Sequence, residues 1–336
     1  MSLRYFGTDG VRGVAFEPPL TLEEVTRWGA AWSMEAKVAG VSRLVIGWDP
    51  RLSSEPMAEA FMRGVGTSLE VLVLGLAPTP AVAWNVARLS AEGAKTWGLM
   101  ISASHNPPED NGLKGFNEVG EKLEEDQERA IEAAFDADPT PHPVAAQPKP
   151  LDLDPYLKHL EGIDLPADFR VVIDCAHGAT ARAAKRLFRG GSITWLGVPA
   201  EGARINVLAQ DRAACGDAPP GVVGTLMTNG GLAQALSGLG VPFVRTAVGD
   251  KYLLREMGKR GWDLAAEASG HLIQKRVGPS GDGPAAALSV LRALLHRSEE
   301  HRWAWTFQPW PQRLVNLRAK ARRPVEDCAA LTACMA

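Results

Sequence analysis

The sequence lacks the features that mark several large classes of protein. It contains only 4 cysteines in 336 residues, with neither the spacing of metal ligands nor a disulfide framework, which favours a reduced cytoplasmic protein. No apolar run approaches the length of a membrane span, and the opening residues do not resemble a signal peptide. Lys and Arg total 36 against 39 Asp and Glu, a near balance that argues against a polyanion as partner. We therefore expect a cytoplasmic protein that binds neither membrane nor nucleic acid.

Short apolar runs alternate with amphipathic stretches along the first half of the chain. The elements expected from this periodicity are strands at Leu44–Trp48, Glu70–Leu76 and Gly98–Ser102, and helices at Glu55–Leu69, Thr79–Leu89 and Glu121–Phe135. Such alternation is typical of a mixed or parallel sheet that is covered by helices. The same alternation resumes near Pro155. The elements expected there are strands at Arg170–Asp174, Val222–Leu226, Val241–Thr246 and Arg313–Lys320, and helices at Thr180–Phe188, Gly231–Leu236, Lys251–Lys259, Pro284–His296 and Val325–Cys334. We therefore predict an α/β protein with domains in series.

Proline separates the first of these domains from the rest. The stretch ADPTPHPVAAQPKP, residues 137–150, is too rich in proline for a helix and is interpreted as a linker. The first domain is then residues 1–136. Changes in the pattern divide the remaining chain into residues 151–220, 221–308 and 309–336.

The strongest chemical signal is Ile101–Asn117, with the sequence ISASHNPPEDNGLKGFN. Ser104 follows the end of an expected strand, where ligands bind in α/β sheets. Ser104 and the adjacent His105 could form a nucleophile–base pair or merely a turn. Asp110-Asn111-Gly112 is interpreted first as a turn. Spacing alone leaves both interpretations of Ser104 open.

Two motifs carry a family resemblance. ASHNP followed by DNGLK resembles the active-serine signature of the α-D-phosphohexomutases, and YFGTDGVRG at residues 5–13 resembles the opening motif of their phosphoglucosamine branch. The resemblance implies that Ser104 carries a phosphoryl group and that Lys114 handles the proton of a sugar hydroxyl. It implies that Arg12 contacts the phosphate. The implied catalytic residues are Ser104, His105, Lys114 and Arg12.

Further segments resemble the family in the same order along the chain. They are Asp49-Pro50-Arg51, APTPAVA at 77–83, DCAHGA at 174–179, GTLMTN at 224–229, RTAVGDKY at 245–252, EASGH at 267–271 and GDG at 281–283. The substrate-binding residues that the resemblance implies are Arg245, Gly249, Asp250, Glu267, Ser269 and His271. Any one of these matches is more often structural, but their order and number favour function.

The activity implied by the resemblance interconverts glucosamine 6-phosphate and glucosamine 1-phosphate, for amino-sugar and peptidoglycan precursor synthesis. It proceeds through a phosphoserine and a bisphosphate intermediate, with glucosamine 1,6-bisphosphate as primer. A phosphoserine and a sugar phosphate are both strongly anionic, so arginines, backbone N–H groups and Mg²⁺ are needed to offset their repulsion. The expected partner is a hexosamine phosphate, and a homodimer is compatible with the sequence.

Three alternatives stay open. The substrate could be a phosphoglucose or a phosphomannose, since Glu267 and Ser269 serve several sugars in the family. The chain could be a non-catalytic remnant that binds a sugar phosphate or a partner subunit. A serine hydrolase is disfavoured because the sequence has no nucleophile-elbow motif around Ser104.

The sequence also departs from the family pattern. The family's metal loop supplies three carboxylates to Mg²⁺, which requires oxygen ligands. Here only Gln210-Asp211-Arg212 resembles it, so the metal-ligand candidates are Ser104 and Asp211, the latter either a remnant of the loop or a chance match. We expect mixed-sheet α/β domains of the phosphohexomutase type, with a shortened second domain (151–220) that lacks most of the metal loop. The third domain (221–308) carries the sugar-binding loop, and residues 309–336 are a stub of a fourth. We expect mutase activity to be impaired.

Overall fold

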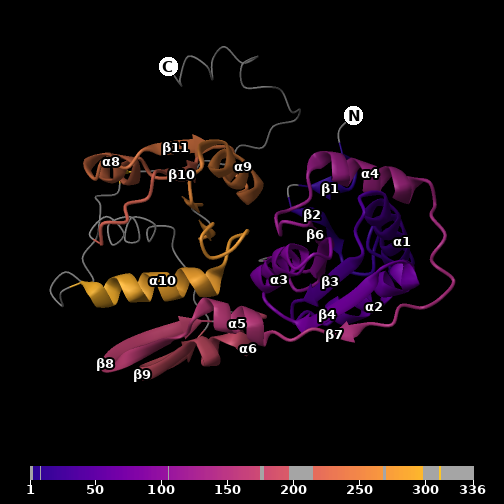
Figure 1. The fold of residues 1–336 in the computed structure, drawn as a ribbon, viewed down its shortest axis with the longest axis horizontal. Coiled ribbons are helices and arrows are strands. Elements are labelled where there is room, and N and C mark those ends of the chain that lie inside the picture. Colours follow the sequence, from indigo (N-terminus) through magenta and orange to yellow (C-terminus); the bar gives the residue numbers. More distant parts are fainter. Residues whose placement is uncertain are drawn as a thin grey trace, which may run out of the picture.

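The computed structural model describes residues 3–7, 9–104, 106–174, 178–196, 215–267, 270–297 and 310–311. Three β-sheets, each accompanied by helices, follow one another along the chain (Figure 1). We call them the first unit (residues 3–150), the second unit (151–196) and the third unit (215–297). Within the residues just given, no helix has the length and apolar character needed to cross a membrane.

The first unit is built on a seven-stranded sheet of order β1-β2-β6-β5-β3-β4-β7. Its strands are β1 (Phe6–Gly7), β2 (Gly10–Val14), β3 (Arg43–Trp48), β4 (Glu70–Leu76), β5 (Thr96–Ile101), β6 (Asp110–Phe116) and β7 (Lys149–Pro150). Its helices are α1 (Leu22–Val38), α2 (Ser54–Val65), the 3₁₀ turn η1 (Gly66–Ser68), α3 (Thr79–Ala91) and α4 (Glu125–Asp136). Strand β3 pairs in parallel with β4 and β5, whereas β6 runs antiparallel to β5 and β2. The sheet is therefore mixed, as expected.

The middle of this sheet forms the core. Every residue of β5 is buried, as in strands that are covered on both faces. Helix α1 begins with a capping box, in which Thr21 and Glu24 satisfy each other's backbone N–H groups. Trp28 of α1 stacks on Phe135 of α4 with 3.7 Å between the ring centroids. These contacts hold the sheet rigidly under the loops that leave its strand ends.

Two local predictions are corrected by the structure. Asp110-Asn111-Gly112 is not a turn but the start of β6, because residues 110–113 find hydrogen-bond partners in β2. The helix expected at Glu121–Phe135 begins only at Glu125. Before it, the Asn117 side chain accepts the N–H groups of Val119 and Glu121 and holds the chain in a turn. Residues 117–124 are therefore a loop.

The stretch interpreted as a linker contains no helix, in agreement with its proline content. Its last two residues form β7, which pairs in parallel with β4 at the edge of the first sheet. The linker therefore also completes that sheet before the chain enters the second unit.

The second unit is small. Its elements are α5 (Asp154–Leu160), β8 (Ile163–Asp174), α6 (Ala181–Leu187) and β9 (Phe188–Leu196). The two strands pair in parallel as a two-stranded sheet. The strand expected at Arg170–Asp174 lies within the longer β8.

The third unit has a four-stranded sheet of order β11-β10-β12-β13. Its elements are β10 (Val222–Thr225), α8 (Gly230–Gly238), β11 (Phe243–Thr246), α9 (Asp250–Arg260), β12 (Leu264–Ala266), β13 (Leu272–Gln274) and α10 (Gly283–His296). The strands and helices predicted at 222–226, 231–236, 251–259 and 284–296 are confirmed within a few residues. The strand predicted at Arg313–Lys320 and the helix at Val325–Cys334 lie outside the described residues.

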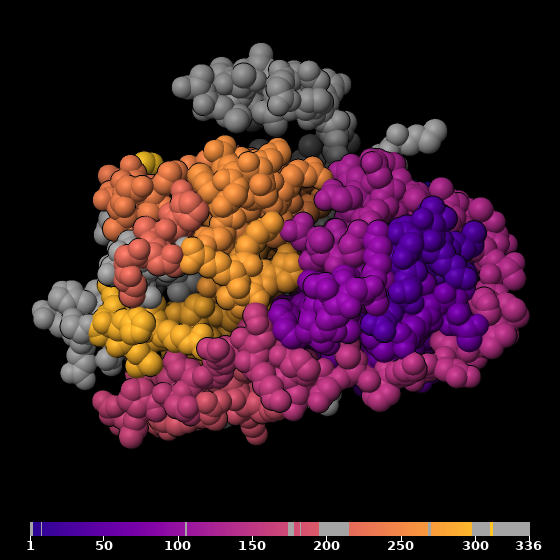
Figure 2. Space-filling view, in the orientation of Figure 1, coloured from indigo at the N-terminus to yellow at the C-terminus, as the bar shows by residue number. Residues whose placement is uncertain are grey.

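The three units share an apolar core. One cluster combines Val82 of α3, Leu157 of α5 and Leu288 of α10. In the space-filling view the third unit lies directly against the first (Figure 2). This packing sets the loops of the third unit opposite the carboxyl end of β5.

Candidate active site

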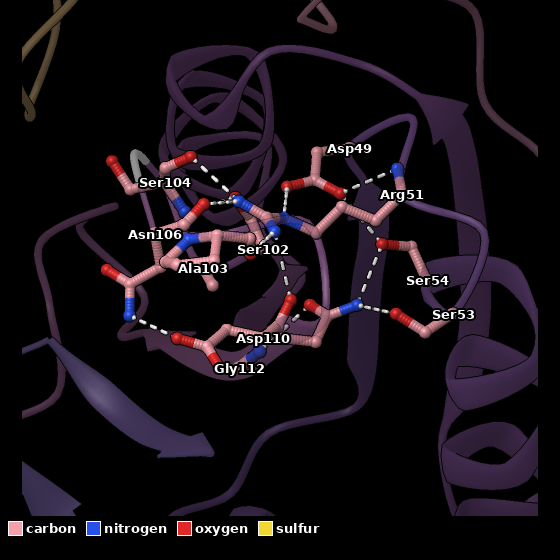
Figure 3. Close-up of polar contacts among 12 residues, drawn as sticks. Asp49, Arg51, Ser53, Ser54, Ser102, Ala103, Ser104, Asn106, Asp110 and Gly112 are labelled. Carbon is pink, nitrogen blue, oxygen red and sulfur yellow. Dashed lines mark hydrogen bonds and ion pairs between the residues drawn. The ribbon is translucent and has the colours of Figure 1, made fainter. Parts of the chain in front are cut away.

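Ser104 lies on a loop whose backbone carbonyl groups are hydrogen-bonded to the side chain of Arg51. The loop leaves β5 after Ile101 and returns to the sheet in β6. The Arg51 guanidinium donates to the carbonyl oxygens of Ser104 at 3.0 Å, Asn106 at 2.9 Å and Asp110 at 3.0 Å (Figure 3). It also donates to the carbonyl of Pro107. A planar fork with five N–H donors can tie so many carbonyls together, whereas a lysine cannot.

A buried carboxylate fixes Arg51 in turn. Asp49, at the end of β3, accepts from Arg51 Nε at 3.0 Å and from Ser54 Oγ at 2.8 Å. The Asn111 side chain donates to Ser53 and Ser54 from the facing strand. The hydrogen bonds that fix Arg51 thus link the start of α2 and the end of β3 to β6.

The backbone at Ser104 is left-handed, with φ 58°. This conformation costs a non-glycine residue about 1–3 kcal/mol and persists only where its surroundings enforce it. Here the Ser104 N–H donates to Ser102 Oγ at 3.0 Å while Arg51 holds the Ser104 carbonyl. The result is an exposed serine side chain presented at the mouth of a cavity.

The cavity, of about 520 Å³, lies between the first and third units. Its lining includes seven of the residues that the sequence singled out: Arg12, Ser104, Lys114, Gly249, Asp250, Glu267 and His271. Tyr5, Asp9, Thr79, Phe116, Lys122 and Ser280 complete much of the wall. The described structure therefore brings the serine, the basic groups and the acidic loop into one space.

Asp9 lies at the centre of the basic groups. Its carboxylate pairs with Lys114 at 3.0 Å, with Lys122 at 2.5 Å and with Arg12. Lys122 also pairs with Asp250 at 2.6 Å. Arg12 donates to the side-chain oxygen of Asn106 at 3.1 Å and so touches the serine loop. The site gathers three basic side chains, Arg12, Lys114 and Lys122, which suits a phosphorylated ligand.

Burial changes the acid–base properties of these groups. Loss of hydration, with added repulsion from Arg12 and Lys122, lowers the pKa of Lys114 to about 7. Burial and the nearby Arg51 lower the pKa of Arg12, but the guanidinium stays protonated. Lys114 is therefore a group that can accept a proton near neutral pH.

On the opposite wall, Glu267 is held by two donors. Gly249 N–H donates to Glu267 Oε1 at 2.7 Å, and His271 Nδ1 lies 3.1 Å from Oε2. Burial raises the pKa of Glu267, but these hydrogen bonds outweigh that effect and leave its pKa below the usual value. An ionised Glu267 is an acceptor for sugar hydroxyls.

Four other predicted residues are not among the described residues that line the cavity. Arg245 is not among the residues that line the cavity; it donates to the Thr228 carbonyl at 3.2 Å and covers the Phe243 ring. His105, Ser269 and Asp211 lie outside the described residues. Asp9 and Lys122 were missed. Asp9 stands within the YFGTDGVRG motif, which gave a signal, whereas Lys122 falls in a segment predicted to be helix surface.

The magnesium site implied by the family resemblance can be tested against the donors present. Among the described residues, no group of three His, Cys, Asp or Glu side chains could hold a metal ion. The acidic residues of the cavity wall are engaged with basic groups: Asp9 and Asp250 with Lys122, and Glu267 with His271. The described donors therefore do not form a magnesium cage, and we derive no step through the ion.

A mixed α/β fold with a loop serine and three basic side chains around a cavity of about 520 Å³ is suited to a phosphorylated ligand. Residues 3–141 match the family "phosphoglucomutase/phosphomannomutase, alpha/beta/alpha domain I", and residues 202–304 match domain III of the same family. A phosphoglucosamine mutase of Azotobacter vinelandii is 34% identical, over 99% of this chain and 88% of the relative. The chain belongs to the phosphohexomutase family, a family of phosphosugar mutases.

Solved structures show the same fold. A phosphoglucomutase/phosphomannomutase family protein of Burkholderia thailandensis superposes with a TM-score of 0.72 and 19% identity, over 88% of this chain and 78% of the other. An N-acetylphosphoglucosamine mutase of Aspergillus fumigatus, crystallised with GlcNAc-6P and magnesium, gives a TM-score of 0.61 at 16% identity, over 96% and 83% of the two chains.

The chain is nevertheless shortened internally. The alignment with the Azotobacter mutase extends over 400 residues, whereas this chain has only 336. The relative therefore carries several dozen residues that have no counterpart here. The domain III match begins at residue 202, before the boundary placed at 221.

Proposed function

We propose that the chain acts on glucosamine phosphates and transfers a phosphoryl group between Ser104 Oγ and the 1- and 6-hydroxyls of the sugar. The sugar is suggested by the phosphoglucosamine mutases, one of which shares 34% identity over nearly the whole chain. One observation carries the proposal: Ser104, Arg12, Lys114 and Glu267 line a single cavity between two units.

In the first transfer, the phosphoryl group moves from phosphorylated Ser104 to a free sugar hydroxyl. The O–P bond to Ser104 breaks, and a new O–P bond to the sugar forms a bisphosphate. Lys114, neutral near pH 7, accepts the hydroxyl proton, which is then returned to the Ser104 oxygen. After the sugar turns over, the steps run in reverse with its other phosphate. Atoms and charge balance in each half.

The remaining groups position the reactants. Arg12 and Lys122 offset the negative charge of two phosphoryl groups, which otherwise repel each other. Glu267 accepts hydrogen bonds from sugar hydroxyls and so fixes which oxygen faces Ser104. The roles that the resemblance implies remain predictions for Arg245, His105, Ser269 and Asp211. The magnesium requirement, the bisphosphate primer, the cytoplasmic location and the homodimer also remain predictions.

The activity of the chain is proposed to be low. We infer that the several dozen residues absent relative to the Azotobacter mutase include the counterpart of the family's metal loop, because only Gln210-Asp211-Arg212 resembles that loop in this sequence. A lost oriented charge or donor costs about 2.7–4 kcal/mol of transition-state stabilisation, which is a factor of a hundred or more. The same shortening favours a second candidate function, a binding protein for sugar phosphates that no longer turns them over.

Mass spectrometry separates these candidates. The purified chain is incubated with glucosamine 1,6-bisphosphate and Mg²⁺, digested, and searched for phosphate on Ser104. Conversion of glucosamine 6-phosphate is followed in parallel. Phosphate on Ser104 with slow conversion supports the proposal, and phosphate without conversion limits the chain to transfer from the bisphosphate to Ser104. A chain that binds the sugar phosphate but never carries phosphate on Ser104 supports the binding protein.

A further inference from the structure

The loop before α4 connects the first unit to the third through ion pairs. We call residues 121–124 the bridging segment. Three of its four residues pair with residues of the third unit. The pairs are Glu121–Lys275 at 3.0 Å, Lys122–Asp250 at 2.6 Å and Glu124–Arg255 at 3.2 Å. The three charged residues of the segment are negative, positive and negative in turn, and each meets a residue of opposite charge in the third unit.

The central pair is the most buried of the three. The Glu121–Lys275 pair is intermediate, with side chains 29% and 31% exposed. The side chains of Lys122 and Asp250 are only 15% and 20% exposed. Those of Glu124 and Arg255 are 62% and 46% exposed, so solvent and salt screen that pair. Removing one partner of a largely buried pair leaves the other charge without compensation, which is far more costly than breaking an exposed pair. Of the three charged residues in the bridging segment, Lys122 is therefore the one whose removal should most weaken the contact between the first and third units.

Lys122 also reaches the catalytic side of the cavity. Its ammonium pairs with Asp9 at 2.5 Å, and Asp9 pairs with Lys114 at 3.0 Å. In the other direction, Asp250 begins α9 directly after Gly249, whose N–H donates to Glu267 Oε1. One lysine therefore lies between the group proposed to move protons and the carboxylate proposed to orient the sugar.

The local backbone fixes the position of Lys122. Phe116 and Lys122 pair through an antiparallel bridge, and Asn117 holds the intervening turn. Gly120, with φ 76°, lies so close to the Ala83 carbonyl and to Pro279 that a Cβ there would collide with both. The turn is consequently wedged between α3 and the third unit, and Lys122 has little freedom to point elsewhere.

We propose that Lys122 is a positioning residue that holds the Gly249–Asp250 loop of the third unit against the Asp9–Lys114 pair of the first. The inference rests on the proposed function, because it assigns to Lys122 the alignment of the sugar-orienting wall with the phosphorylated serine. Lys122 itself touches no reacting atom in this assignment. Its charge also disfavours protonation of Lys114, whose pKa burial already lowers.

The first test uses hydrogen exchange of the full chain and needs no activity. The amides of residues 251–253 report on the start of α9, and those of β5 serve as an internal reference. Lys122→Met should accelerate exchange at 251–253 by at least about tenfold without changing β5, because the first turn of α9 loses its anchor. Lys275→Met, the matched control on an outer pair, should leave exchange at 251–253 within about twofold. Equal exchange in Lys122→Met and the native chain would overturn the proposal.

A second variant covers the case in which Lys122→Met fails to fold. Asp250→Asn removes the pair from the other side and should give the same local acceleration. If both single variants fold, the double variant should be no worse than either, as expected for two residues that act as a unit. Lys122→Arg retains the charge and should keep exchange close to native. If the increases in exchange rate of the two single variants add in the double variant, the assignment is contradicted. It is also contradicted if Lys122→Arg accelerates exchange as much as Lys122→Met does.

Kinetics then separate this inference from the proposed function. The charged groups that affect Lys114 are Arg12, Lys122, Asp250 and Asp49, with Asp9 in direct contact. Without Lys122, the pH at which phosphoryl transfer reaches half its maximum should move upward, and KM should rise more than kcat falls. A native chain with no transfer at all refutes the proposed function, while the exchange experiment still decides the role of Lys122. A Lys122→Met chain with native kinetics and native exchange refutes only the positioning role.

Discussion

The two walls of the cavity are built differently. The serine wall belongs to a seven-stranded sheet with a completely buried central strand, and Arg51 ties its loop together through carbonyl oxygens. The opposite wall belongs to a sheet of four strands, none longer than four residues, in the described third unit. There the Gly249 N–H donates to Glu267 Oε1, and His271 Nδ1 lies 3.1 Å from Glu267 Oε2. The serine wall is preorganised, whereas the other wall depends on docking.

This difference fits the chemistry of phosphoryl transfer. The oxygen that exchanges the phosphoryl group must be fixed, because catalysis relies on positioning and charge stabilisation. In the proposed reaction, the wall that contacts the sugar must admit it in two orientations. A less rigid wall that is held in place by Lys122 and by the shared apolar core serves that purpose. Changes to the serine wall should therefore abolish reaction, while changes to the other wall should alter its alignment.

The largest effect is expected from Ser104→Ala. If Ser104 carries the phosphoryl group as proposed, its loss should reduce phosphoryl transfer by at least about a thousandfold, because alanine has no oxygen to accept the group. Stability should change little, because the Ser104 side chain is exposed. Phosphate incorporation from the bisphosphate primer measures the effect. Ser42→Ala, on an exposed serine of the same unit, is the control and should behave as native. Phosphate incorporation that persists in Ser104→Ala would show that another residue is the nucleophile.

The next effect is expected from Arg51→Lys, which tests whether the serine wall is rigid. Lysine keeps the charge but cannot hold several carbonyls in one plane, so the left-handed backbone at Ser104 should relax. We expect phosphoryl transfer to fall by about 10–100-fold and the free energy of unfolding to fall by about 1–3 kcal/mol. Urea unfolding and primer-dependent phosphorylation measure the two losses.

The matched control is Arg43→Lys, which alters a partly exposed pair with Glu70 on the same sheet, away from the cavity. Its cost should stay below about 1 kcal/mol. Equal losses in the two variants would mean that Arg51 is an ordinary structural arginine and that the contrast between the walls is wrong.

Much of the first unit could be predicted from sequence, since β4 and α3 follow clear hydrophobic periodicity. Strand β6 could not, because its Asp-Asn-Gly start favours a turn until the neighbouring strands supply hydrogen bonds. Further along β6, only packing reveals why residue 115 is a glycine: a Cβ at Gly115 would collide with Trp32 and Leu123. Long-range pairing overrode the local signal.

The site shows the same division. Ser104, Arg12, Lys114 and Glu267 could be predicted because each stands in a motif that resembles the family. Lys122 could not, because charge at the start of a predicted helix suggests a solvated surface and nothing local reveals Asp250 across the cavity. The roles of the motif residues stay predictions until the experiments above are made.

A smaller effect concerns the pH dependence of transfer. If Lys114 accepts the hydroxyl proton, kcat/KM should rise about tenfold per pH unit below pH 7 and level off above it, since the pKa of Lys114 is about 7. Ionisation of the substrate phosphate, with a pKa near 6, contributes below that value and must be measured separately. Lys114→Gln should lose the limb near pH 7 together with most activity. A native profile in Lys114→Gln would show that the proton goes to another group.

The smallest effect tests the docking of the less rigid wall. Asp282 caps α10 through the Ala285 N–H and accepts from Tyr156 of the second unit at 2.8 Å, beside the cavity residues Ser280 and Gly281. Burial raises the pKa of Asp282 from 3.8 to about 6, despite the hydrogen bonds from Ala285 and Tyr156, which lower it. The folded state therefore holds the proton more tightly than the unfolded chain.

The stability contributed by protonated Asp282 is present below about pH 4 and is lost as the pH rises to about 6. Asp282→Asn should remove this decline, which we expect to amount to about 1–3 kcal/mol in urea unfolding across that window. Tyr156→Phe removes a hydrogen bond that lowers the pKa of Asp282, so its decline should extend to higher pH. Phosphoryl transfer at neutral pH should change little in Asp282→Asn, because amide and carboxylate oxygens can both cap the helix. If the free energy of unfolding depends on pH in the same way in Asp282→Asn and in the native chain, Asp282 does not titrate in this window. The wall of the third unit would then be held in place by Lys122 and apolar packing alone.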